Sequence, residues 1–158
     1  CGEEQNYDII IPQAAEAQIA TIIPVDDATF MNPENMENAL IHYCRHHALQ
    51  VPKNKAEIVR CVLQSLAFKY RQAVEQLNRC LPSPIRQLNI IGGGSQNQLL
   101  NQLTADELGI PVYAGPVEAT AMGNILTQAM AKGEIADLRE LREIVTRSVT
   151  PQVYYPKK

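Results

Sequence analysis

Several features that mark whole classes of protein are missing from this sequence. No apolar run approaches the ~20 residues needed to span a bilayer, and no charged-then-apolar start indicates a signal peptide. No basic run occurs beyond Lys157-Lys158, the net charge is −3 and the pI is about 5.6. These absences argue against a membrane or a nucleic acid as the partner, and with no export signal we expect a cytoplasmic protein.

Cysteine is sparse and shows no metal-binding or redox spacing. None of the four cysteines forms a CxxC pair, and the density is too low for a secreted disulfide scaffold. Cys44 and Cys61 flank a predicted turn at similar distances, so a disulfide between them is one alternative. The favoured alternative, in a reducing compartment, is that both cysteines are buried and reduced. The chain begins at Cys1 rather than Met, so we expect it to be cut from something longer.

Glycine is nearly absent from the first 91 residues and then concentrated. Only Gly2 precedes position 92, whereas six of the eight glycines lie between Gly92 and Gly123. The rest of the composition is that of an ordinary globular domain, with 46% apolar and 20% charged residues among 158. Unusual backbone conformations are therefore expected in one part of the chain only.

Residues 1–32 predict short or extended elements. Residues 7–17 favour a short helix that contains Pro12, and residues 21–25 (TIIPV) favour a short strand or extended segment. Asp26 and Asp27 form a pair that could ligate a metal, although adjacent acids before a turn are more often a solvated loop.

Residues 33–81 predict a long helical hairpin. Asn32 followed by Pro33 predicts a helix start, and this helix is expected to reach about residue 50. Asn54 with Glu57 resembles a capping box and opens a second helix that is expected to end near residue 80. Its apolar residues predict one continuous buried face: Val59, Leu63, Leu66, Tyr70, Ala73 and Leu77. The short connection at 51–53 implies that the two helices are antiparallel.

Residues 86–148 change to a strand–helix–strand–helix–helix pattern. Strands are expected at 88–91 and 111–114, and helices at 95–108, 117–132 and from Asp137 to about 147. Gly109 and Gly133 end two of these helices. Short loops between such elements favour an α/β fold with a short parallel sheet, and the tail at 149–158 is expected to be extended.

The sequence Ile90-Ile-Gly-Gly-Gly-Ser-Gln-Asn97 falls at a predicted strand-to-helix turn. Glycines let backbone N–H groups approach a ligand closely, and the helix start beyond them favours polar or anionic groups. No Gly-Lys-Ser/Thr follows, so this is not a Walker loop, and Asn97 breaks the G-x-G-x-x-G pattern. No acidic residue ends the next strand either, which disfavours a dinucleotide-dependent oxidoreductase. The turn indicates a nucleotide or sugar-phosphate site, with a tight turn that binds nothing as the alternative.

Several motifs together resemble the C-terminal domain of the FGGY family of carbohydrate kinases, from about residue 7 to 149. They are residues 92–97 (GGGSQN), 102–106 (QLTAD), 109–112 (GIPV) and 118–123 (EATAMG). Residues 62–68 (VLQSLAF) are similar to the long helix of that family, although Gln64 stands where Glu is common. The resemblance implies part of a ribonuclease H-like domain of the actin/hexokinase kind.

The resemblance also implies a chemistry and its site residues. Such kinases transfer the γ-phosphoryl group of Mg²⁺-bound ATP to a sugar that an N-terminal domain helps to bind. Gly93 and Gly94, with Gly92 and Ser95 in the same turn, would bring backbone against the nucleoside, and Asn97 would hydrogen-bond the base. No counterpart of the family's general base or phosphate loops is found here. No catalytic residue is therefore assigned, and this chain alone is expected to be inactive.

Two further segments, residues 24–36 (PVDDATFMNPENM) and 114–118 (AGPVE), narrow the resemblance to family members that act on L-rhamnulose. That would make the product L-rhamnulose 1-phosphate, in rhamnose catabolism. Members acting on fuculose or xylulose, and an interaction module that kept the fold and lost the ligand, are the alternatives.

Three remaining features favour structural roles or assembly. His42 and His46 have a spacing able to bind a metal, but no third ligand is evident and a solvated helix face is favoured, so no metal site is predicted. Glu118 at a helix start is stabilising in any protein. Because only two strands are predicted, we expect an exposed sheet edge that promotes self-association.

Overall fold

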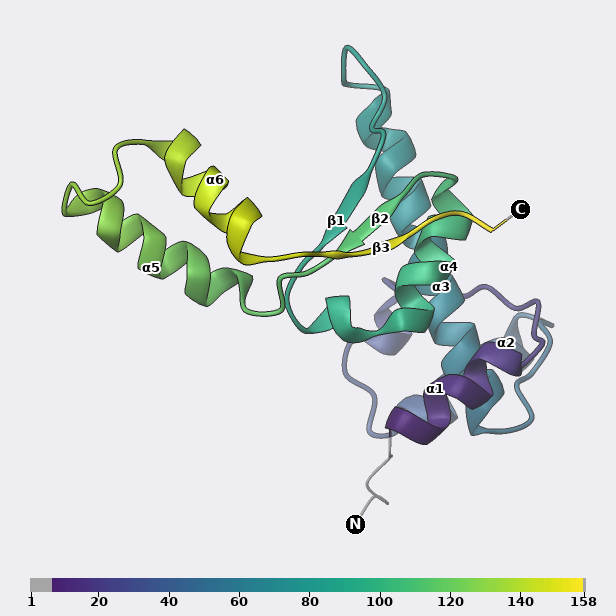
Figure 1. The fold of residues 1–158 in the computed structure, drawn as a ribbon. Helices are drawn as coiled ribbons and strands as arrows, with labels where there is room; N and C mark the ends of the chain where they lie inside the picture. Colours follow the sequence, from purple (N-terminus) through teal and green to yellow (C-terminus); the bar gives the residue numbers. More distant parts are fainter. Residues whose placement is uncertain (1–6, 158) are drawn as a thin grey trace. The chain divides into compact units, whose positions relative to one another are not determined.

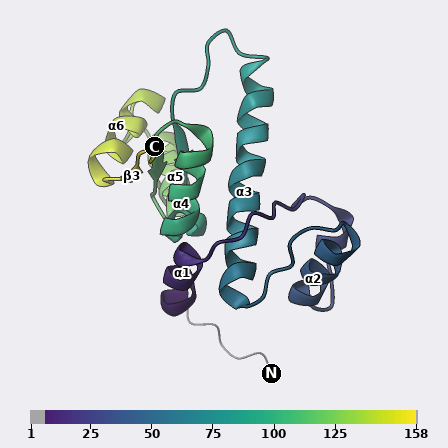
Figure 2. The same ribbon diagram turned by 90° about the vertical axis from the view of Figure 1, so that its right-hand side faces the viewer.

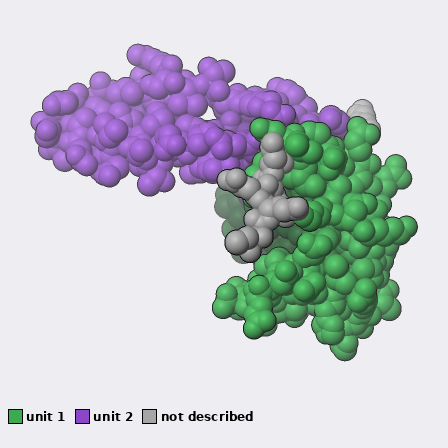
Figure 3. All heavy atoms as spheres, turned by 90° about the horizontal axis from the view of Figure 1, so that it is seen from below, with its two compact units in different colours: residues 1–83 green, residues 84–158 purple. Residues whose placement is uncertain are grey.

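The structure is a computed structural model that describes residues 7–157. The chain divides into two compact units, residues 1–83 and 84–158 (Figure 3). The observations on Cys1 and Gly2, and the first six residues of the predicted 1–32 segment, lie outside the described residues. The α/β class is confirmed, with helices in both units and strands in the second.

The first unit is helical, as Figure 1 shows. It contains α1 (Tyr7–Glu16), the short 3-10 helix η1 (Ala28–Phe30), α2 (Met36–His46) and α3 (Lys55–Asn78). Helix α1, with Pro12 inside it, confirms the prediction for residues 7–17. It packs against α3, and Figure 2 shows it beside the first half of that helix.

Local side-chain caps determine where α2 and α3 begin. The Asn54 side chain accepts a hydrogen bond from Glu57 N at 2.9 Å, and the Glu57 carboxylate accepts one from Lys53 N at 2.8 Å. The predicted start of α3 is thus confirmed. The start at Asn32 is wrong, because Asn35 caps α2 instead and accepts a hydrogen bond from Asn38 N.

Residues 17–24 are irregular, and no strand forms at 21–25. Side chains of α3 take the place of a neighbouring strand here. Gln64 Nε2 donates to the carbonyls of Ile19 and Thr21 at 2.9 and 2.8 Å, and Ile23 N donates to Ser65 Oγ at 3.0 Å. The polar groups of this segment are therefore satisfied without a sheet.

The core of the first unit joins this segment to α2 and to the beginning of α3. Its buried members are Ile19, Ile23, Leu40, Cys44 and Cys61. Helix α2 meets α3 only near the start of α3 and does not run alongside it, so the antiparallel hairpin is wrong in this respect (Figure 2).

The continuous buried face that we predicted for α3 is also wrong. Of the six residues in that stripe only Leu63 is fully buried, and Ala73 and Leu77 are exposed. The buried positions of α3 lie on two sides instead, because both α1 and the irregular segment contact the helix: Cys61, Leu63, Ser65, Ala67 and Val74.

The second unit is built around a small sheet with the strand order β1-β2-β3. Strand β1 (Leu88–Ile90) pairs in parallel with β2 (Val112–Ala114), with Leu88 opposite Val112. Strand β3 (Gln152–Tyr154) pairs antiparallel with β2, with Tyr154 opposite Val112. Within the described residues the sheet is thus mixed rather than parallel, and its third strand was not predicted.

Helices cover or flank this sheet (Figure 1). They are the 3-10 helix η2 (Gly93–Gln96), α4 (Gln98–Leu108), α5 (Ala119–Ala131) and α6 (Leu138–Ser148). Helix α4 packs on β2 and β3 through the fully buried Ala105. Gln102 Nε2 donates to the Tyr155 carbonyl and Lys157 N donates to Asp106 Oδ1, so α4 also holds the tail.

Helices α5 and α6 pack against each other and remain largely exposed. Asp137 caps α6 as predicted and accepts hydrogen bonds from Arg139 N and Glu140 N. Ile125 and Leu138 keep 66% and 51% of their surface exposed, so this helix pair has an apolar surface that is not covered. None of the described helices is long and apolar enough to cross a membrane.

Candidate functional site

The loops that follow β1 and β2 lie together at one edge of the sheet. The carboxyl ends of parallel strands meet at the same edge, where α/β proteins commonly bind ligands. Gly115 N donates to the Ile90 carbonyl at 2.8 Å, and Gly92 N donates to the Pro116 carbonyl at 3.0 Å. The peptide bond between Gly115 and Pro116 is cis. These two hydrogen bonds connect the loops to each other directly beyond the strands.

Gly92 gives the first loop its shape. Its φ of 73° and ψ of −161° define a backbone conformation that side chains disfavour, so the fold favours glycine here. Its carbonyl accepts hydrogen bonds from Ser95 N at 3.0 Å and from Ser95 Oγ at 2.6 Å. Ser95 therefore closes the turn onto Gly92.

Gly93 and Gly94 are glycines for a different reason. Neither has a positive φ, a Cβ on Gly93 would meet no atom within 4 Å, and a Cβ on Gly94 would meet only Ile90 Cγ2 at 3.8 Å. Both residues are exposed. The fold thus tolerates side chains at both positions, and their absence leaves backbone open to a ligand that approaches from outside.

Asn97 lies where the turn becomes helix α4. The predicted helix start at Ser95 is wrong, because a 3-10 turn precedes Asn97 and Asn97 itself caps α4. Asn97 Oδ1 accepts a hydrogen bond from Leu100 N at 3.0 Å. This cap uses the side-chain oxygen, so the side-chain nitrogen of Asn97 can donate to a ligand while the cap is kept.

Asn101 is a residue of this site that the sequence interpretation missed. It is fully buried, and its Nδ2 donates to the Ser95 carbonyl at 2.8 Å. The sequence did hold a signal, because Asn101 is a polar residue next to Leu100 and near Leu103. Asn101 connects α4 to the glycine turn.

A hollow of about 640 Å³ borders the turn. Its wall combines Ser95, Gln96 and Gln98 with residues 114–118 and with residues 149, 150 and 152 before and within β3. Glu118, which precedes α5 and makes no capping hydrogen bond, is the one charged lining residue in the described part. With no lysine or arginine in that wall, the hollow suits an uncharged polar group better than a triphosphate.

The structure therefore brings most predicted site residues together. Gly92, Gly93, Gly94, Ser95 and Asn97 form one continuous turn, and Ser95 reaches the hollow. The arrangement can present backbone amides and one side-chain amide to the flat polar edge of a ligand. The Ser95 hydroxyl in the turn donates to the Gly92 carbonyl and so serves the shape of the turn.

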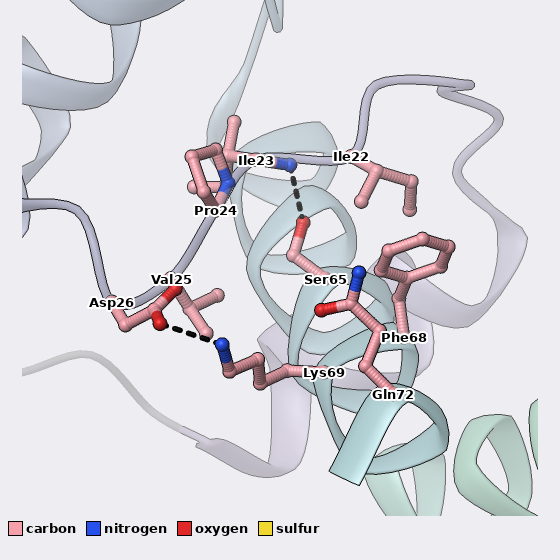
Figure 4. A pocket seen from close by; sticks show the side chains of 9 residues that line it. All are labelled: Ile22, Ile23, Pro24, Val25, Asp26, Ser65, Phe68, Lys69 and Gln72. Atoms are coloured by element: carbon pink, nitrogen blue, oxygen red, sulfur yellow. Dashed lines mark hydrogen bonds and ion pairs between the residues drawn. The ribbon is translucent and has the colours of Figure 1, made fainter. Parts of the chain in front are cut away.

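A smaller hollow in the first unit is a weaker candidate. It measures about 210 Å³ and lies between residues 22–26 and α3 (Figure 4). Lys69 Nζ donates to Asp26 Oδ2 at 2.6 Å, and this hydrogen bond lowers the pKa of Asp26. The Asp27 carboxylate accepts from Thr29 N at the start of η1. Both acids of the pair thus have structural partners.

The histidines of α2 are arranged as rings on a helix surface. The rings of His42 and His46 are 6.4 Å apart, and that of His47 lies 4.2 Å from Tyr43. Among the described residues no three His, Cys, Asp or Glu side chains gather as a metal site.

Cys44 and Cys61 are free, buried thiols in one core cluster, so the disulfide alternative is not what the structure contains. Burial raises the pKa of both thiols, that of Cys61 to about 11. Cys61 Sγ also donates to the Thr21 carbonyl at 3.4 Å. Both cysteines therefore act as core residues.

Comparison with known proteins identifies the class to which this fold and turn belong. Residues 10–132 match the C-terminal domain of the FGGY family of carbohydrate kinases, so the chain belongs to that family. The match runs across both compact units.

Rhamnulokinases are among the curated proteins to which the chain is similar. The chain is 44% identical to the rhamnulokinase of Bacteroides thetaiotaomicron over 155 residues, which are 98% of this chain and 32% of that protein. It is 47% identical to the rhamnulokinase of Pectobacterium carotovorum over 160 residues, with coverages of 99% and 32%. For that of Bacillus subtilis the identity is 44%, with coverages of 85% and 28%. The chain thus spans about a third of the length of these relatives.

Proposed function

We propose that this chain forms the nucleoside-binding part of an ATP-dependent kinase that converts L-rhamnulose to L-rhamnulose 1-phosphate. One observation carries the proposal: Gly93 and Gly94 lack a Cβ for which the fold has room, in a turn whose next residues, Ser95 and Gln96, line a hollow at the carboxyl ends of parallel strands. The names of the relatives support L-rhamnulose as the substrate over fuculose or xylulose.

Each residue of the turn has a distinct role in this proposal. Gly92 and Ser95 hold the turn closed, so that the backbone at Gly93 and Gly94 faces the nucleoside. Asn97 Nδ2 donates to an acceptor on the base edge, while Asn97 Oδ1 stays on Leu100 N. The lining, which holds no lysine or arginine among the described residues, accommodates the nucleoside and leaves the phosphates to other residues.

ATP supplies the γ-phosphoryl group, and Mg²⁺ accompanies its phosphates and offsets their charge. The described residues offer a fit for adenosine rather than for this ion, since no ligand cluster is present among them. We therefore propose that the phosphate loops, the general base and most sugar contacts lie in parts of the kinase beyond this chain. The chain alone is then expected to be inactive.

The same proposal covers fold, location and assembly. The pairing of β1 with β2 and the glycine turn are compatible with one part of a ribonuclease H-like ATPase domain. A kinase that uses the cellular ATP pool works in the cytoplasm. The uncovered residues Ile125 and Leu138 support self-association of the isolated chain, which light scattering would detect as a mass above 17.6 kDa.

Activity measurements on the full gene product test the proposal. Purified protein is supplied with ATP, Mg²⁺ and L-rhamnulose, L-fuculose or D-xylulose, and ADP formation is followed with a coupled assay. We expect kcat/KM to be highest for L-rhamnulose. Preference for another sugar would overturn the substrate, and nucleotide binding without phosphorylation of any sugar would favour a non-catalytic module.

A further inference from the structure

We propose that Asn101 is a positioning residue for the nucleotide, because its buried side-chain amide holds the glycine turn in its ligand-accepting shape. This inference rests on the proposed nucleotide-binding function. It concerns a residue that does not line the hollow and would act through the turn.

A chain of hydrogen bonds leads from Asn101 to the loop after β2. Asn101 Nδ2 donates to the Ser95 carbonyl at 2.8 Å, and Ser95 donates to the Gly92 carbonyl through Oγ at 2.6 Å. Gly92 N in turn donates to the Pro116 carbonyl at 3.0 Å. Three bonds therefore fix helix α4, the turn and the second loop to one another.

Burying the polar side chain of Asn101 is unfavourable unless its hydrogen bond to the Ser95 carbonyl compensates. The residue is fully buried, and its Oδ1 has no hydrogen-bond partner among the described residues. A leucine has the same branch at Cγ and would remove the unpaired Oδ1, but it would also take from the Ser95 carbonyl the donor that Asn101 supplies. Asn101 thus keeps one of its own polar atoms unpaired while it holds the Ser95 carbonyl, and we attribute the amide at this position to the turn that the bond holds.

Thr104 supplies a matched control on the same helix. It is also fully buried, and its Oγ1 donates to the Leu100 carbonyl at 2.7 Å within α4. Thr104→Val removes one buried polar group without touching the turn. It therefore measures what the loss of a buried hydrogen bond in this helix does by itself.

The test compares Asn101→Leu, Thr104→Val and the unaltered full gene product. Direct titration with a fluorescent ATP analogue gives the nucleotide Kd, steady-state kinetics give KM for ATP and for the sugar, and thermal unfolding gives Tm. We expect Asn101→Leu to raise the Kd and the KM for ATP about fivefold or more. This factor corresponds to the net free energy of roughly one hydrogen bond, here the one that orders the turn. The KM for the sugar should stay within about twofold. Thr104→Val should leave all of these values unchanged.

A folded Asn101→Leu variant with native nucleotide affinity would overturn the inference and leave the proposed function intact. Equal losses for ATP and sugar, together with a lowered Tm, would overturn it as well, since they indicate a merely structural role. Absence of any nucleotide affinity in the unaltered protein would instead overturn the proposed function, and this inference with it.

Asn101→Asp keeps the proposal testable if the leucine variant fails to fold. A buried Asp is protonated more readily than an exposed one, and its protonated form can donate to the Ser95 carbonyl as Asn101 does. The ratio of its Kd to that of the unaltered protein should therefore fall as the pH is lowered from about 8 to about 5.5. A ratio that does not change with pH would contradict the inference.

Discussion

Gly92 and Pro116 are joined by a backbone hydrogen bond of 3.0 Å from Gly92 N to the Pro116 carbonyl, which ties the glycine turn to the loop after β2. A second bond runs in the opposite direction, from Gly115 N to the Ile90 carbonyl at 2.8 Å. The two loops thus form one structure at the end of the parallel strand pair. Changes in the conformation of one loop are expected to reach the other.

Gly92→Ala and Gly93→Ala should separate the folding role from the ligand role within one glycine run. Gly92 has a φ of 73°, so an alanine there is strained, and we expect the free energy of unfolding to fall by about 1–3 kcal/mol. Gly93 has no such constraint, and Gly93→Ala should leave that free energy nearly unchanged. Denaturation in guanidinium chloride measures both. Equal losses would show that the two positions do not differ in this way.

Asn97 combines a helix cap with a proposed ligand contact, and two substitutions distinguish them. Asn97→Ala removes the acceptor for Leu100 N and should cost about 1 kcal/mol of stability as well as nucleotide affinity. Asn97→Asp keeps an oxygen for the cap and lacks the donor, so its stability should be native while its nucleotide Kd rises.

Thermal unfolding and nucleotide titration of both variants check this prediction. Asp137→Ala is the control, because it removes the cap of α6 away from the turn. Native nucleotide affinity in Asn97→Asp would remove Asn97 from the site.

Tyr154 tests the strand that sequence reasoning did not find. Its ring is buried beside Val112 and Ala114, while its hydroxyl is buried without a partner among the described residues. Tyr154→Phe should therefore match or exceed the native stability, by up to about 1 kcal/mol. Tyr154→Ala should lose about 3–5 kcal/mol, because it empties a large core position. Denaturant titrations decide between these values, and a destabilised Tyr154→Phe would show that the hydroxyl is satisfied.

Cys61 should make stability depend on alkaline pH. Burial raises its pKa from 9.0 to about 11, so the folded protein holds the thiol proton more tightly than the unfolded chain does. This contribution to stability is complete below about pH 9 and is lost as the pH rises toward about 11, at up to about 1.4 kcal/mol per pH unit.

Unfolding curves across that range measure the slope, with Cys61→Ala as the matched comparison that should show a smaller slope, because the buried Cys44 still contributes. Alkylation with iodoacetamide, read by peptide mapping, supplies a second readout. The exposed Cys80 should react before Cys44 and Cys61 in the folded protein. Rapid alkylation of Cys61 would contradict its burial.

Features governed by a few neighbouring residues could be predicted from the sequence. Asn54 with Glu57 marks the start of α3, Asp137 caps α6, and Gly109 ends α4 with a φ of 66°. The start of α2 was misplaced by three residues. Asn32 and Asn35 can both cap a helix, and Pro33 favours Asn32 as a local signal, but it is the Asn35 side chain that accepts the bond from Asn38 N.

Features that depend on distant partners could not be predicted in this way. Strand β3 has three residues and forms because Tyr154 and Gln152 pair with Val112 and Ala114 of β2. Residues 21–25 have strand-forming composition, yet Gln64 and Ser65 of α3 bind their backbone. In both segments the outcome was determined by contacts made 40 residues or so along the chain.

The candidate site shows the same division. The turn at 92–97 was predicted because glycine is rare elsewhere and its position between strand and helix is a local property. The bond between Asn101 and Ser95 depends on how η2 folds back over the first turns of α4. The spacing of apolar residues does not predict this contact, so the role of Asn101 is visible only in the structure.

The affinity of the Gly93→Val variant for ATP tests the central claim most directly. A Cβ added at this exposed position meets no atom within 4 Å, so the protein should fold with a near-native Tm. Gly123→Ala, in helix α5 rather than in the glycine turn, serves as the control.

The full gene product and both variants are titrated with ATP by calorimetry. We predict that Gly93→Val weakens binding more than about tenfold, because the added methyl groups occupy the space of the nucleoside, while Gly123→Ala binds as the unaltered protein does. Native affinity in a folded Gly93→Val variant would contradict the assignment of this turn as the nucleotide site.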